Sequence, residues 1–79
     1  MTPALYIRKH VFGFSTQREF AEALGYSQAQ ISRLEDGMAF SSEAQGRIRA
    51  YANLKSVSWD NNWFFEVPRN ASHGHGRAA

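Results

Sequence analysis

The chain has 79 residues, of which 43% are hydrophobic and 14% aromatic, a composition that supports one small packed domain and excludes a disordered chain. Its formal net charge is +2, and residues 1–66 are neutral because Arg69 and Arg77 lie beyond them, so any polyanion must be met by a local patch. The absence of cysteine, of a run near the ~20 apolar residues of a membrane span and of a signal-peptide layout predicts a soluble, cytoplasmic protein.

Capping residues predict two helices in the first 25 residues. Thr2 is followed by a proline, the usual order of an N-cap and first helical position, and this helix should end near Gly13. Thr16 and Glu19 have the spacing of a capping box at the start of a second helix. Gly25 is expected to end that helix, because glycine adopts the left-handed conformation without steric cost.

A third helix is predicted over 28–35, with Ser27 as its N-cap and Gly37 after its end. Ile31 and Leu34 are its inward positions. Polar side chains therefore occupy most of the remaining surface of this helix, including Gln28 and Gln30 in its first turn, where core packing does not require them.

The C-terminal third begins with a fourth expected helix over 42–54, after a short loop. Residues 58–66 have two interpretations, because bulky aromatics suit either a short fifth helix or a strand over 63–67. We favour the helix. The part of the chain over 67–79 has no apolar period and is expected to be a flexible tail.

The second and third helices, joined by a short turn that contains Gly25, have the layout of a helix-turn-helix, although such corners also occur in proteins that do not meet DNA. The stretch STQREFAEALGYSQAQISRLEDG resembles the helix-turn-helix of the Cro and lambda-repressor-like (XRE) family of transcriptional regulators. The matching residues are Thr16-Gln17, Phe20-Ala21, Leu24-Gly25, Ser27-Gln28, Ile31-Ser32, Leu34-Glu35 and Gly37. The resemblance covers about residues 4–57. It implies an all-α, compact bundle of about five helices, with the helix-turn-helix at about 16–37 and the helix over 28–35 as recognition helix.

The recognition helix supplies the residues expected to read bases. In this class the N-terminal residues of that helix contact base edges in the major groove, where each base pair presents its own donor and acceptor pattern. An amide such as that of Gln28 suits adenine, and Arg33 suits guanine or a phosphate. The predicted base-reading residues are Ser27, Gln28, Ala29, Ser32 and Arg33. Gln30 is a weaker candidate, because it flanks this face.

Contacts with the DNA backbone are expected on both sides of the reading face. Gln17 stands at the start of the second helix, where unpaired N–H groups favour an anion, and its family counterpart holds the DNA backbone. Arg18 lies beside it, and the other flank consists of the loop and helix start that precede residue 43. The predicted backbone residues are Gln17, Arg18, Phe40, Ser41 and Ser42. Candidates of lower weight are Arg8, Lys9, Arg47, Arg49 and Lys55; for Arg47 and Arg49 a solvated face is the favoured interpretation.

Four large aromatics stand within seven residues near the C-terminus, namely Trp59, Trp63, Phe64 and Phe65. One interpretation is that two of them close the bundle. The other assigns the segment 58–66 to a two-fold dimer interface, where aromatic residues are enriched. A homodimer is favoured, because one copy of this size contacts too few base pairs for tight specific binding, and two copies suit an inverted repeat.

Catalysis and cofactors are not expected. The sequence has no nucleophile arrangement, phosphate-binding glycine loop or carboxylate pair suited to an enzyme. His73 and His75 lack a third ligand nearby, so neither a metal site nor any other cofactor is predicted, and no small-molecule ligand is expected.

We therefore expect a bacterial or phage-encoded dimeric repressor or controller that binds double-stranded DNA. The alternative is a protein-binding module, an antitoxin or antiactivator, that keeps the helix-turn-helix scaffold and binds its partner through the aromatic segment.

Overall fold

Hydroxyl side chains begin the four α-helices in the described part of the chain. In the computed structural model, which describes residues 1–69, each of these side chains accepts a hydrogen bond from a backbone N–H group three residues ahead. The helices and their caps are α1 (Pro3–Tyr6) with Thr2, α2 (Gln17–Leu24) with Thr16, α3 (Gln28–Glu35) with Ser27, and α4 (Ser42–Leu54) with Ser41. The predicted starts of the first four helices are confirmed.

The first helix widens after its first turn. α1 continues directly into η1 (Ile7–Val11), a stretch of π-helix in which the Phe12 N–H donates to the Ile7 carbonyl oxygen at 3.0 Å. Ile7 and Arg8 are both buried in this wide turn. The segment ends at Phe12, and Gly13 follows with φ of 77°, which matches the predicted end.

The turn between α2 and α3 is fixed from outside by α4. Gly25 ends α2 with φ of 78°, a conformation that favours glycine. Arg47 of α4 donates from Nη1 to the Leu24 and Gly25 carbonyl oxygens, at 2.9 and 3.3 Å. Its guanidinium also lies 4.6 Å from the centre of the Tyr26 ring. Arg47 is exposed, as the favoured interpretation expects, and in addition its guanidinium holds the turn.

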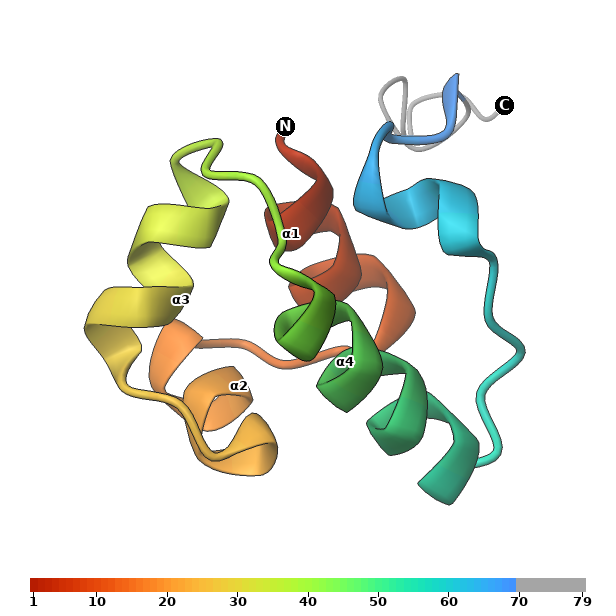
Figure 1. Cartoon of the computed structure of the whole chain (residues 1–79), viewed down its shortest axis with the longest axis horizontal. Helices are drawn as coiled ribbons and strands as arrows, with labels where there is room; N and C mark the ends of the chain where they lie inside the picture. The colour runs from red at the N-terminus through yellow and green to blue at the C-terminus, as the bar shows by residue number, and fades with distance from the viewer. Residues whose placement is uncertain (70–79) are drawn as a thin grey trace.

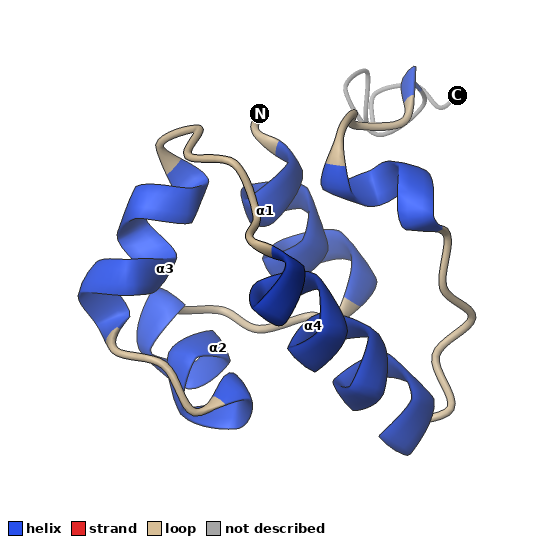
Figure 2. Cartoon of the chain, in the orientation of Figure 1, coloured by secondary structure: helices blue, strands red, loops and turns tan. Residues whose placement is uncertain are grey.

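The core lies where the helices meet. α1 packs against α3 and against the C-terminal η2 (Asn61–Phe64), while α2 packs against α3 and α4 (Figure 1). The buried cluster consists of Ala4, Ile7, Phe20, Ala21, Leu24, Ile31, Leu34, Ile48 and Phe64. The residues that the structure describes are all-helical and compact, without strands (Figure 2). None of their helices is long and apolar enough to cross a membrane.

The C-terminal segment corrects the expectation of a fifth α-helix or a strand. η2 is one turn of 3-10 helix, capped by Asp60, whose side chain accepts from the Asn62 N–H group at 2.9 Å. Asp and Asn are weak helix formers that prefer caps and turns, so Asp60, Asn61 and Asn62 suit the start of a short turn better than the first turn of a longer α-helix. Of the expected tail, residues 70–79 lie outside the described residues.

Candidate functional site

One edge of α3 carries polar side chains that the fold does not use. Gln28, Ala29 and Arg33 are exposed, and Ser32 is half-buried, whereas Ile31 and Leu34 on the other side of the helix are buried in the core. Neither Gln28 nor Arg33 makes a side-chain hydrogen bond or ion pair with the described part of the chain. Their donors and acceptors are therefore available to a partner.

Ser27 and Gln30 lie on the same first turn but serve the helix itself. The Gln30 N–H group donates to Ser27 Oγ at 3.2 Å, and the Ser27 N–H group donates to Gln30 Oε1 at 2.8 Å. This is a capping box with a glutamine at its third position. Much of the hydrogen-bonding capacity of Ser27 and Gln30 is therefore used within the protein, which separates them from Gln28.

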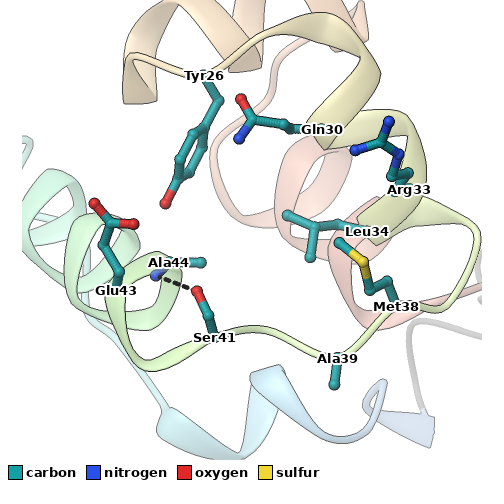
Figure 3. Close-up of a pocket in the computed structure, with 9 residues that line it drawn as sticks. All are labelled: Tyr26, Gln30, Arg33, Leu34, Met38, Ala39, Ser41, Glu43 and Ala44. Atoms are coloured by element: carbon teal, nitrogen blue, oxygen red, sulfur yellow. Dashed lines mark hydrogen bonds between the residues drawn. The ribbon is translucent and has the colours of Figure 1, made fainter.

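A hollow of about 170 Å³ lies beside this edge, between α3 and the start of α4 (Figure 3). Tyr26 and Gln30 line it from the α3 side, and Ser41 and Glu43 line it from the α4 side. Arg33 also borders the hollow. Because Arg33 and Glu43 carry opposite charges, the hollow has no strong preference for an anion.

Gln17 stands at the first position of α2, as predicted, but its amide is already engaged. Nε2 of Gln17 donates to Oε1 of Glu35 at 3.1 Å. Arg8 forms an ion pair with the same carboxylate, with 2.6 Å between Nε and Oε2. The side chains of Arg8 and Glu35 are only 9% and 7% exposed, so Arg8 is not available to a phosphate, contrary to its lower-weight assignment.

The Arg8–Glu35 pair was missed by the sequence analysis, although the sequence holds one signal of it. Arg8 falls four residues after the buried Ala4 and three before the half-buried Val11, which places it on the apolar side of its helix. A charged residue at such a position is almost never buried unless it is paired. The identity of the partner is not readable from this local pattern, because Glu35 lies 27 residues away.

The other predicted backbone contacts differ in how accessible they are. Arg18 is exposed and pairs with Glu22 at 3.5 Å, an arrangement that contributes little to stability at a solvated surface. Ser41 and Ser42 are exposed at the start of α4. Phe40 is half-buried, and its ring centre lies 5.1 Å from that of Phe64. Only the backbone of Phe40, not its side chain, is therefore suited to a surface contact.

The four C-terminal aromatics divide between core and surface. Phe64 is only 4% exposed and belongs to the core, while Trp59 and Trp63 are half-buried and pack against it. Phe65 is 72% exposed. Phe64 fills the space against Phe40 and Trp59, so its assignment to a dimer interface is corrected. Phe65 is the aromatic that remains open to a partner.

No protein-family model, curated protein or solved structure matches this chain. The functional interpretation therefore depends on the chemistry of its own residues and on the motif over residues 16–37.

The remaining cations and the tail complete the survey. Lys9 is exposed on η1. Arg49 lies 5.7 Å from the Phe64 ring centre and Lys55 lies 5.7 Å from that of Tyr51, and these contacts hold both of them against α4 and its neighbours. His73, His75 and Arg77 lie outside the described residues.

Proposed function

We propose that this protein is a sequence-specific DNA-binding transcriptional regulator in which α2 and α3 form a helix-turn-helix. The observation that supports it best is the pair Gln28 and Arg33, whose polar groups are exposed on one edge of α3 without a partner in residues 1–69. A helix with unused amide and guanidinium groups on one edge suits the major groove, which accepts one α-helix and offers matching donors and acceptors.

Each residue of this edge has a distinct proposed contact. Gln28 pairs with adenine through both groups of its amide, and Arg33 pairs with guanine or reaches a phosphate. The Ala29 methyl group packs against a thymine methyl, and Ser32 supplies a hydroxyl to a base edge or to a phosphate. Ser27 contributes mainly by holding the first turn, because its hydroxyl group is part of the capping box.

The phosphate contacts come from the two flanks. Gln17 and Arg18 lie at the start of α2, and Ser41 and Ser42 lie at the start of α4. Helix starts present N–H groups without intrahelical partners, which favours an anion. These contacts set the position of the protein on the duplex and carry no base information themselves.

The regulator acts as a homodimer in this proposal, with Phe65 at the contact. Phe65 and Met38 are 72% and 50% exposed, and both line an uncharged groove of about 240 Å³ beside the first turn of α1. A two-fold interface uses the same patch on both copies. Two recognition helices about 34 Å apart then meet successive major grooves of an inverted repeat, as in a repressor or controller of its own operon.

Binding to DNA of the protein's own promoter region, measured by fluorescence anisotropy, tests this function. Gln28→Ala and Arg33→Ala should each weaken binding to the operator about 5- to 150-fold, since one good base contact contributes about 1–3 kcal/mol. Asn53→Ala, which removes an amide from the far end of α4, serves as a matched control for Gln28→Ala and should leave affinity unchanged. If Gln28→Ala and Arg33→Ala bind like the native protein, α3 is not the reading helix.

The second candidate function, a protein-binding module on the same scaffold, has its own support in the exposed Phe65 and Met38. Titration over a range of salt concentrations separates the two. A DNA binder loses affinity steeply as salt rises, because its phosphate contacts release counterions. Complete absence of DNA affinity at low salt would instead favour the protein-binding module.

A further inference from the structure

The carboxylate of Glu35 joins the two helices of the proposed helix-turn-helix at the end opposite their turn. Glu35 is the last residue of α3, and Gln17 is the first residue of α2. We infer that Glu35 is a positioning residue for DNA binding, which holds the Gln17 amide in place for a phosphate. This inference rests on the proposed function and deepens it, because it assigns the geometry of one contact to a residue that touches no DNA.

The hydrogen bonds around Glu35 leave its carboxylate little freedom. Oε1 accepts from Gln17 Nε2 at 3.1 Å and from Arg8 Nη2 at 3.2 Å, and Oε2 accepts from Arg8 Nε at 2.6 Å. Arg8 also donates from Nη1 to the Phe14 and Ser15 carbonyl oxygens, at 3.3 and 2.8 Å. The carboxylate is therefore bonded to η1 and to α2, and Arg8 is itself bonded to the segment that leads into α2.

The consequence for Gln17 follows from the chemistry of an amide. Its nitrogen has two hydrogens, and one of them is directed to Glu35. The second N–H group of the half-buried Gln17 is left for an acceptor at the surface, which a phosphate oxygen supplies. Because Glu35 already fixes the side chain before binding, the contact does not require Gln17 to lose rotamer freedom when DNA arrives.

Arg8 has a separate part in this arrangement, which is electrostatic. The negative charge of Glu35 would repel a phosphate bound on the other side of the Gln17 amide. The positive charge of the Arg8 guanidinium compensates the charge of Glu35. Glu35 can therefore serve as an acceptor near a polyanion only while Arg8 is present. For this reason, the two residues must be changed together when the role of the acceptor is tested.

The test uses two double variants of the full chain that differ only at residue 35. Arg8→Met/Glu35→Gln keeps an acceptor oxygen for Gln17 and removes both charges, while Arg8→Met/Glu35→Leu removes the charges and the acceptor. Operator affinity should be about three- to tenfold higher for the Gln version than for the Leu version, as expected for one well-placed hydrogen bond. Adding Gln17→Ala to each should abolish that difference.

Thr2→Ala is the structural control. Thr2 Oγ1 donates to the Glu35 carbonyl oxygen at 2.8 Å, so its loss weakens the same corner of the fold without touching the carboxylate. Thr2→Ala should lower the melting temperature. It should leave DNA affinity within about twofold of the native value, because it removes no group that is proposed to contact DNA. A loss of affinity equal to that of the Leu double variant would show that Glu35 affects DNA binding only through the stability of the fold, and it would overturn the inference.

Equal operator affinity of the Gln and Leu double variants would also overturn it, while leaving the proposed function intact. Absence of DNA binding by the native protein would instead defeat the proposed function. If the Leu variant does not fold, the native protein supplies the answer by NMR: the side-chain amide protons of Gln17 should exchange with solvent more slowly than those of Gln28. Equally fast exchange would show that Glu35 does not hold Gln17.

Discussion

The replacement Gly25→Ala tests the turn between α2 and α3 directly. Gly25 has φ of 78°, and a Cβ atom added there lies 3.1 Å from Nη1 of Arg47. An alanine in the left-handed conformation costs about 1–2 kcal/mol. The methyl group also displaces the guanidinium that bonds the Leu24 and Gly25 carbonyl oxygens, and weakening those bonds adds about 0.5–1 kcal/mol.

The total loss of about 1.5–3 kcal/mol should lower the melting temperature by roughly 6–24 °C in a domain of this size. Thermal unfolding followed by circular dichroism at 222 nm measures it directly. Gly46→Ala is the matched control with the opposite sign, since no heavy atom lies within 4 Å of its added Cβ. At this position inside α4, alanine should raise stability by up to about 1 kcal/mol.

Arg47→Ala separates the two parts of the Gly25 effect. Without Arg47 the added methyl group meets no guanidinium, so Gly25→Ala should then cost only the backbone part of about 1–2 kcal/mol. The reasoning is refuted if Gly25→Ala unfolds at or above the temperature of the native protein. It is also refuted if Gly25→Ala and Gly46→Ala shift that temperature in the same direction.

Two further predictions concern the buried pair and the C-terminal aromatics. Arg8→Met should lower the free energy of unfolding, measured in urea, by about 3–5 kcal/mol, because it leaves the Glu35 carboxylate buried without its ion-pair partner. Adding Glu35→Leu should recover most of this stability. No recovery would contradict the role of the ion pair. Phe64→Ala should cost about 3–5 kcal/mol, whereas Phe65→Ala should change monomer stability by less than about 0.5 kcal/mol. In sedimentation equilibrium, Phe65→Ala should raise the dimer dissociation constant at least about tenfold, and an unchanged constant would place the dimer contact elsewhere.

The helix bounds were predictable from the sequence because their causes are local. A hydroxyl cap or a glycine at a helix end acts on backbone groups within four residues of itself. The roles of Thr16, Ser27 and Gly25 could therefore be predicted without knowledge of the fold. The exposed edge of α3 was predictable for the same reason, since Ile31 and Leu34 fix which side of the helix is buried and so leave Gln28 and Arg33 outside.

The contacts that organise the site were not predictable, because they join residues far apart in the chain. Arg47 reaches the turn from 22 or 23 residues away, and Arg8 finds Glu35 across 27. Nothing in a local pattern distinguishes such an arginine from one on a solvated face. The fifth α-helix is absent from the described residues for another reason: the aromatics around Trp63 suit a helix, but the preceding Asp60 and Asn61 have poor helix propensity.

The dependence of the turn on Arg47 limits how α3, the proposed recognition helix, can be redesigned. Residues 16–37 do not form a cassette that can be moved to another scaffold, because part of their geometry is supplied by α4. Under the proposed function, a change of DNA preference is instead accessible by point substitution, since Gln28, Ala29 and Arg33 are exposed and support neither the turn nor the core. The proposed reading residues and the architecture are then separable by residue but not by segment.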